Sequence, residues 1–249
     1  MFNFTNNLYK SIFLLFIAYG IIGYFLEVIT TSLEQKKINL TRGFLVGPIV
    51  PIYGVGSLLI TLFLSTYKND LVVLFVMSLV LCSVVEFTTS YIMEKAFKLR
   101  WWDYSHMKYN LDGRICLLNA VLFGIGGVLV VKYVNNILFI IINSMTSVVF
   151  NILFYILLII FITDLVVTLI VMNKLKINTA KYLNKDATNK IRQEVRKQLE
   201  NSSFLVKRLL NSFPKLDKIN IEFSKIKDII FPNKISLTER IITLFNRKK

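Results

Sequence analysis

Long apolar runs are the feature that most restricts how this chain can fold. Four runs, at about 11–32, 45–66, 70–93 and 115–134, each approach the roughly 20 residues that an α-helix needs to cross a bilayer. The mean hydropathy of +0.59 is also unusual for a soluble domain. The first run is not followed by the small-residue cleavage pattern of a signal peptide. We therefore expect an all-α polytopic membrane protein.

A fifth apolar stretch runs from Ile137 to Met172. It is too long for one ordinary span and too short for two, at about 1.5 Å of rise per residue. Its first part is also the more polar, with asparagine, serine and threonine side chains between 143 and 151. We predict a short interfacial or re-entrant helix at about 137–147 on the outer side and a fifth span at about 150–172.

The distribution of positive charge predicts the orientation. The loop before span two carries three cations and the loop before span four carries five, whereas the other loops carry one each. Cytoplasmic loops are enriched in Lys and Arg, so both basic loops should be cytoplasmic. Five spans, with the N-terminus outside and the C-terminal tail in the cytoplasm, satisfy this pattern. The cations of the two loops are Lys36, Lys37, Arg42, Lys95, Lys98, Arg100, Lys108 and Arg114.

The tail differs in composition from the rest, so we divide the chain into a transmembrane domain at 1–173 and a basic cytoplasmic tail at 174–249. The tail carries most of the net charge of +15, and apolar residues recur in it near helical spacing. Basic amphipathic helices suit an anionic membrane surface. The alternative is a solvated tail that only enforces orientation. Nothing in the chain resembles a nucleic-acid reading module, so we expect no nucleic-acid partner.

Charged residues inside the spans carry the functional hypothesis. Glu27, Glu86 and Asp164 lie within spans one, three and five, and Arg42 and Arg114 open spans two and four. A bare charge at mid-bilayer costs roughly 2.5–3.5 kcal/mol, so such residues pair or line a polar cavity. Helix rise places the three carboxyl groups roughly 9–12 Å inside the cytoplasmic ends of their spans. We predict one shared substrate or ion site there. The alternative is internal salt bridging that fixes helix packing.

The start of span two adds a hydroxyl to this layer. Pro48 and Pro51 stand among glycines, and proline breaks the hydrogen bonds of a helix. We expect either a broken helix that lines a cavity or close packing of small residues. Tyr53 lies near this bend and is a candidate site residue.

The second cytoplasmic loop contains an aromatic and charged block. Its members are Arg100, Trp101, Trp102, Asp103 and Tyr104. Tryptophan and tyrosine rings favour the membrane interface, so one reading is an interfacial anchor. The other is a lid over the charged layer, in which a Trp stacks on a ligand or an Arg binds a phosphate.

No catalytic set accompanies these residues. The chain has one histidine, two cysteines without metal-site spacing and no Gly-x-x-x-x-Gly-Lys-Ser/Thr phosphate loop. We expect no metal and no ATPase activity from this chain, and the sequence leaves the question of a cofactor open. A membrane enzyme acting on a lipid or isoprenoid headgroup through the same carboxylates remains an alternative. A non-catalytic assembly or regulatory subunit is another.

Two hairpins repeat one design. Glu27, a basic loop and Arg42-Gly43 precede a glycine-rich span, and Glu86, a basic loop and Gly113-Arg114 precede another. Tandem repeats of this kind are common in transporters, where the site lies between them.

Three segments carry a family resemblance: 23–27 (GYFLE), 42–56 (RGFLVGPIVPIYGVG), and the stretch from Glu86 to Gly124 with its WWDYS and NLDGRICLLN blocks. Over about residues 8–175 the chain resembles the CmpB-like ABC-transporter permease (type IV) family of Firmicutes-type bacteria. The resemblance implies a permease-like transporter subunit in the bacterial cytoplasmic membrane, a separate ATPase subunit and a homo-oligomer or other partner. It also adds Asn119 to the site and Asn110 to the lid, and Asp164 fits an acidic position in the family's last span.

Overall fold

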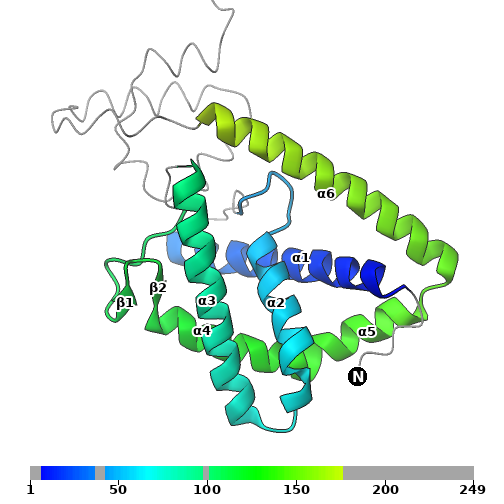
Figure 1. Ribbon diagram of the computed structural model, residues 1–249, viewed down its shortest axis with the longest axis horizontal. Helices are drawn as coiled ribbons and strands as arrows, with labels where there is room; N and C mark the ends of the chain where they lie inside the picture. The colour runs from blue at the N-terminus through cyan, green and yellow to red at the C-terminus, as the bar shows by residue number, and fades with distance from the viewer. Residues whose placement is uncertain (1–6, 37–42, 98–100, 176–249) are drawn as a thin grey trace, which may run out of the picture.

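The computed structural model describes residues 7–36, 43–97 and 101–175 (Figure 1). Nearly all of the predicted tail, together with Arg42 and Arg100, therefore lies outside the described residues. The described chain is mainly helical. Its elements are α1 (Leu8–Gln35), α2 (Pro51–Leu64), η1 (Ser65–Tyr67), α3 (Leu71–Phe97), β1 (Asn110–Leu111), β2 (Ile115–Cys116), α4 (Leu117–Leu129), η2 (Val130–Val134), α5 (Asn135–Ser144) and α6 (Ser147–Leu175).

Four helical stretches in the described part of the chain are long and apolar enough to cross a membrane. A fifth, Pro51–Tyr67, is apolar but shorter. The expected all-α polytopic membrane architecture is thus confirmed. The four long stretches are Leu8–Leu33, Leu71–Phe97, Leu117–Ser144 and Ser147–Ile170.

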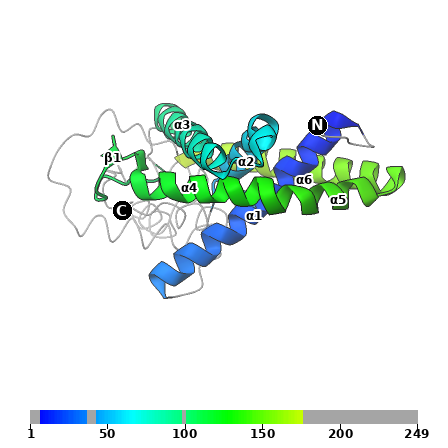
Figure 2. The same cartoon turned by 90° about the horizontal axis from the view of Figure 1, so that it is seen from below.

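The region after span four differs from the expectation of a separate short helix at 137–147. Helix α5 continues directly from α4 through the π-helical turn η2, and Figure 2 shows α4 and α5 as one continuous helical rod. The helix ends only at Ser144, where Met145 turns to an extended conformation with φ −72° and ψ 136°. Polar residues near this end do not interrupt the helix, because the Ser144 hydroxyl donates a 2.9 Å hydrogen bond to the Ile141 carbonyl.

Span two begins later than the apolar run suggests. Residues 43–48 form bends, Val50 is extended, and the helix starts with Pro51 in its first position. Proline suits that position because its missing N–H would have no partner there and its φ is already helical. The predicted break near the two prolines therefore places an unwound segment, 43–50, in front of α2.

Small residues allow the helices to approach closely. A Cβ on Gly54 of α2 would lie 2.6 Å from the ring of Phe16 on α1, and one on Gly124 of α4 would lie 2.5 Å from the ring of Phe75 on α3. Without a hydrophobic driving force between helices in lipid, such van der Waals contact is a main source of association. Helices α1 and α2 thus form one tight pair, and α3 and α4 form another.

Helix α6 packs against α1 in the same direction. The ammonium group of Lys10, in the first turn of α1, donates a 2.6 Å hydrogen bond to Asn151 at the start of α6. Further along, the ring of Phe161 of α6 meets the ring of Phe16 of α1 edge-on, with 5.4 Å between their centroids. Figures 1 and 2 show the beginning of α1 near the corner between α5 and α6.

Candidate functional site

Glu27 of α1 meets Tyr53 of α2. The Tyr53 hydroxyl donates a 3.0 Å hydrogen bond to Oε1 of Glu27. Gly23, one turn before Glu27, makes this contact possible, because a Cβ there would overlap the Tyr53 ring. The glycine and the glutamate of the GYFLE segment therefore serve one interaction.

Glu86 of α3 is the most buried of the three intramembrane carboxyl groups. Its side chain is 5% exposed, and the hydroxyl of Tyr104 donates a 3.2 Å hydrogen bond to its Oε1. Asn119, in the first turn of α4, lies close enough to act on the same carboxyl group. The other oxygen, Oε2, is buried and has no hydrogen-bond partner among the described residues.

These groups form one site, which we call the carboxyl cluster: Glu27, Tyr53, Glu86, Tyr104 and Asn119. The charge of Glu27 acts on Glu86, and both act on the two tyrosines. Helices α2 and α4 begin beside the cluster and have no side-chain N-cap, so the positive ends of their dipoles are at this level. The structure thus brings together four of the predicted site residues and one predicted lid residue.

Tyr104 remains a hydrogen-bond donor to Glu86. Its own burial, followed by the negative charges of Glu86 and Glu27, raises the pKa of Tyr104 well above its ordinary value of 10.0. The phenol therefore keeps its proton throughout the physiological range.

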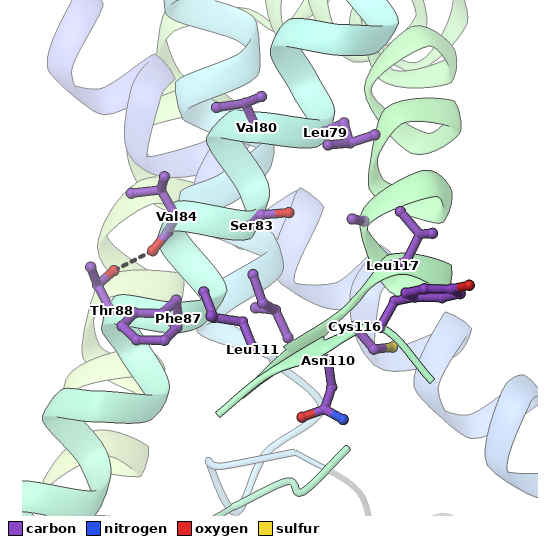
Figure 3. Close-up of a pocket in the computed structure, with 13 residues that line it drawn as sticks. Leu79, Val80, Ser83, Val84, Phe87, Thr88, Asn110, Leu111, Cys116 and Leu117 are labelled. Atoms are coloured by element: carbon purple, nitrogen blue, oxygen red, sulfur yellow. Dashed lines mark hydrogen bonds between the residues drawn. The ribbon is translucent and has the colours of Figure 1, made fainter. Parts of the chain in front are cut away.

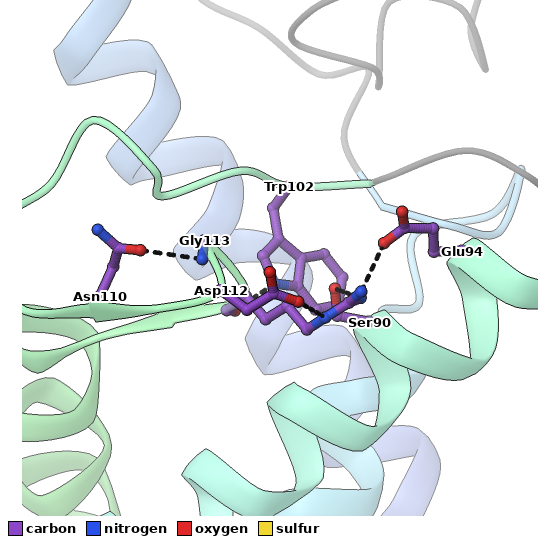
Figure 4. Close-up of polar contacts among 7 residues, drawn as sticks. Ser90, Glu94, Trp102, Asn110, Asp112 and Gly113 are labelled. Atoms are coloured by element: carbon purple, nitrogen blue, oxygen red, sulfur yellow. Dashed lines mark hydrogen bonds and ion pairs between the residues drawn. The ribbon is translucent and has the colours of Figure 1, made fainter.

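Arg114 is directed elsewhere. Its guanidinium group forms ion pairs of 2.8 Å with Glu94 of α3 and with Asp112, and a 3.3 Å hydrogen bond with Ser90 (Figure 4). The side chain is buried and lies over the rings of Phe87 and Tyr91, with its Cζ 5.7 and 5.5 Å from their centroids. Arg114 thus fastens the loop before α4 to the end of α3 and is not the partner of Glu86.

That loop contains a small β-hairpin that we did not predict. Strands β1 and β2 are antiparallel, and the Arg114 N–H donates to the Leu111 carbonyl at 2.9 Å across the turn. Asp112 and Gly113 occupy the turn with φ of +52° and +64°. Asp-Gly is a preferred pair for this type I′ geometry, so the dipeptide was the signal that could have revealed the hairpin.

The predicted lid residues pack around this hairpin. Trp102 donates from Nε1 to the Arg114 carbonyl at 2.9 Å, and the Tyr104 N–H donates to the Gly113 carbonyl at 2.8 Å. Trp101 is buried and stacks edge-on against Phe44, with 5.2 Å between ring centroids. The loop therefore packs as an ordered layer whose Tyr104 reaches the carboxyl cluster.

The polar members of the loop support its turns. Asp103 accepts the Ser105 N–H at 3.0 Å. Asn110 accepts the Gly113 N–H at 2.9 Å and donates to the Met107 carbonyl at 2.7 Å. Both side chains thus serve the loop's own backbone.

Asp164 of α6 holds the unwound segment. It accepts the Gly47 N–H at 2.8 Å and a 3.4 Å hydrogen bond from Thr168, whose hydroxyl in turn accepts the Val46 N–H at 3.2 Å. A Cβ on Gly47 would lie 2.5 Å from the Asp164 carboxyl group. Asp164 therefore supplies hydrogen bonds that the unwound backbone lacks, and these contacts do not include the members of the carboxyl cluster.

A second buried polar group escaped the sequence reasoning. Thr61 of α2 lies 3.0 Å from the Tyr19 hydroxyl of α1 and donates a 3.1 Å hydrogen bond to Asn135, which also accepts from Tyr19. All three side chains are almost fully buried, and we call them the polar triad. Their signal in the sequence was the spacing of Thr61 and Tyr53, and of Tyr19 and Glu27, by two helical turns.

An apolar groove lies outside the carboxyl cluster. It has a volume of about 560 Å³ and runs between α3, the hairpin and the start of α4 (Figure 3). No charged side chain lines it. Within the described ranges, moreover, no three His, Cys, Asp or Glu side chains come together as metal ligands. The carboxyl cluster is therefore the main candidate site.

One family profile matches the chain over residues 14–169, and its description is "Putative ABC-transporter type IV". The match includes every residue of the carboxyl cluster and the polar triad. No curated protein and no solved structure matches the chain.

Proposed function

The chain belongs to the ABC-transporter type IV family described above, and from that membership we propose that it is the permease-like subunit of a transporter whose carboxyl cluster binds a cationic group or a proton. Membrane embedding and a transporter-like character follow from the family and the apolar helices.

The buried carboxyl group of Glu86 is the observation that carries this proposal. Its Oε2 has no hydrogen-bond partner among the described residues, and Arg114 is already paired with Glu94 and Asp112. A carboxylate out of water is expensive unless it is paired, and a second carboxyl group nearby increases the cost. A proton or a bound cation removes that cost, so the site is suited to take one up and release it.

The chemistry of the cluster favours a cation over an anion. Every polar atom facing Glu86 in the contacts above belongs to a carboxyl, phenol or amide group. Oxygen atoms of this kind bind ammonium groups and small metal cations. The dipole ends of α2 and α4 stabilise the carboxylates between turnovers without occupying the site.

Topology is part of the same proposal. Helices α1 and α6 run in the same direction, as expected for an odd number of spans with the N-terminus and the tail on opposite sides. The basic loops favour a cytoplasmic location for the carboxyl cluster and the tail. An ATPase subunit would then bind the cytoplasmic side, and a second copy or another subunit would complete the transport path. The division at residues 173 and 174 remains part of this proposal.

The test is purification of the chain from native membranes in a mild detergent, with mass spectrometry of the proteins and small molecules that remain bound. We expect a stoichiometric ATPase. A panel of amines and metal cations is then added to wild type and Glu86→Gln, and a cargo should raise the Tm of wild type but not of Glu86→Gln. Val84→Ala, at an exposed position of α3 outside the carboxyl cluster, is the matched control and should retain the shift.

Two results would contradict the proposal. One is a chain without ATPase whose cation-induced shift is the same in Glu86→Gln as in wild type. The other is an altered membrane-lipid profile in a Glu86→Gln strain with no ATPase bound, which would favour the membrane-enzyme alternative.

A further inference from the structure

The apolar groove beside the β-hairpin opens toward the lipid. Its walls belong to α3, the hairpin and α4, and both helices lie in stretches that are long and apolar enough to cross a membrane. Three residues of its rim, Val80, Leu111 and Leu117, are between 52% and 60% exposed. Along α3 the lining extends over residues 79–88, about 14 Å of helix. A hydrocarbon chain that enters from the bilayer therefore has room to lie along it.

Ser83 places one unpartnered polar atom in this apolar lining. Its Oγ is buried and has no hydrogen-bond partner among the described residues, and Figure 3 shows the hydroxyl directed from α3 toward α4. Two other polar side chains of the lining, Thr88 and Asn110, already donate to backbone carbonyls at 2.7 Å. A buried hydroxyl without a partner is unfavourable, so Ser83 is a position at which a ligand can gain a hydrogen bond.

The groove adjoins the carboxyl cluster on both helices. On α3, Ser83 precedes Glu86 by three residues, which is roughly 4.5 Å along the axis and roughly 60° around it. On α4, Ala120 of the groove lining directly follows Asn119, which acts on the Glu86 carboxyl group. Ser83 and Ala120 are both small. The groove and the cluster thus lie on adjacent faces of the same helix pair.

Two unpartnered oxygens therefore lie within one turn of α3: Ser83 Oγ in the groove and Glu86 Oε2 at the cluster. Both atoms accept hydrogen bonds, and a carboxylate out of water also needs a positive charge beside it. An ammonium group meets both needs, because it is cationic and has three N–H donors. An anion meets neither, since the Glu86 carboxylate repels it.

The bilayer determines what else such a ligand must carry. Lipid tails are as apolar as the groove lining, so a neutral hydrocarbon chain gains little by leaving the lipid for the groove. A cation without a chain arrives from water, yet the Glu86 side chain is only 5% exposed. A cation on a hydrocarbon chain is concentrated in the membrane, and its chain can occupy the groove.

From these observations we infer that the groove is a lipid-side entrance to the carboxyl cluster and that the cargo is an amphiphilic ammonium compound. Its chain lies between α3, the hairpin and the start of α4. Its ammonium group is shared by Ser83 Oγ and Glu86 Oε2. The inference names a substrate class for the proposed function and rests on it.

Photolabelling tests this site in the full chain, reconstituted in lipid nanodiscs. The probe is dodecylamine with a diazirine at the far end of its chain, and the labelled peptides are identified by mass spectrometry. We expect the label within residues 79–88 or 109–120. An excess of dodecylamine should reduce this labelling at least tenfold. Dodecanol, which has the same chain without the ammonium group, should leave it unchanged.

Two variants fill the groove from opposite walls. Ser83→Leu removes its unpartnered hydroxyl and should reduce the competable labelling at least tenfold. Ala120→Leu repeats the test on α4 if the first variant fails to fold. The matched control is Val148→Leu, which adds volume at a position of α6 that is 68% exposed and outside the groove, and its labelling should equal that of wild type. Labelling that dodecanol competes as well as dodecylamine does, or that both groove variants retain, would overturn the inference.

Methylamine separates this inference from the proposed function. It has the ammonium group without a chain, so the Tm shift that it causes depends on Glu86 and not on the groove. A methylamine shift that Glu86→Gln removes, together with no competable label in the groove, would refute the lipid-side entrance and leave the proposed function standing. No shift with any cation of the panel would refute both.

Discussion

Glu86 and Tyr104 are joined by a 3.2 Å hydrogen bond, although one lies deep in α3 and the other in the loop before the β-hairpin. The bond couples the carboxyl cluster to the position of the loop. Any displacement of the loop removes the hydrogen bond to Oε1, and Oε2 already lacks a partner. The occupancy of the cluster and the docking of the loop should therefore depend on each other.

This coupling has a pH signature at Tyr104. Its pKa is raised by burial and then by the two glutamates, so above pH 10 the unfolded chain loses the proton while the folded protein keeps it. Stability from this group is therefore complete below pH 10 and falls as the pH rises further, by about 1.4 kcal/mol per unit. We expect Tm to fall more steeply above pH 10 in wild type than in Tyr104→Phe. Parallel Tm curves between pH 8 and 11 would refute the assignment.

Gly23→Ala should disrupt the pair formed by Tyr53 and Glu27. The added Cβ overlaps the Tyr53 ring, so either the ring or α1 must move. Overpacking of this kind costs about 1–3 kcal/mol. The fall in Tm on thermal unfolding in detergent measures this loss of stability. The control is Gly126→Ala, where a Cβ meets no atom within 4 Å, and its Tm should be unchanged or higher because alanine favours the helix.

Arg114→Gln should release the hairpin from α3. Glu94 and Asp112 lose their common cation, but both acids are substantially exposed, so solvent screens much of the loss. We expect a cost of about 1–3 kcal/mol, most of it from buried groups left without a hydrogen-bond partner. Limited proteolysis within 101–116 should become faster. Lys108→Gln changes an exposed cation in the same loop and should leave the cleavage rate as it is in wild type.

Asp164 and Glu86 should respond in opposite ways to loss of charge. Asp164→Asn retains an oxygen that can accept the Gly47 N–H, so stability and transport should change little. Asp164→Leu leaves that N–H without its acceptor and should cost about 1–3 kcal/mol. Glu86→Gln, in contrast, should abolish cargo binding while the protein remains folded. Loss of transport in Asp164→Asn with an unchanged Tm would instead place Asp164 among the coupling groups.

Much of the architecture could be predicted from the sequence because a bilayer restricts it so strongly. The lengths of the apolar runs predict the membrane spans. The positions of Glu27 and Glu86 along their spans predict that both carboxyl groups lie at one depth in the membrane. The sequence did not indicate the partners of Arg114, which we expected beside the carboxylates and which pairs with Glu94 and Asp112 in the structure. Its partners depend on a turn at Asp112 and Gly113 that reverses the chain, and hydropathy carries no information about that turn.

Other features depend on contacts between distant segments. The helical spacing relates Tyr19 to Glu27 and Thr61 to Tyr53, but the contact of both with Asn135 exists only because α1, α2 and the turn η2 meet. Likewise, the role of Asp164 depends on the unwound segment that it holds. Helix ends were also difficult to predict, since the Ser144 hydroxyl donates to the Ile141 carbonyl within the helix and the polar residues here do not stop it at the expected place.

The unequal lengths of two helices determine how the protein must fit its membrane. The rod Leu117–Ser144 has 28 residues and is about 42 Å long, whereas the hydrocarbon layer is about 30 Å thick. Pro51–Tyr67, in contrast, is too short to cross that layer upright. Hydrophobic mismatch of opposite sign within one chain is relieved by tilting of the long helix and thinning of the lipid around the short one. The acyl-chain length of the surrounding lipids therefore becomes a variable that sets the relative position of the two helices.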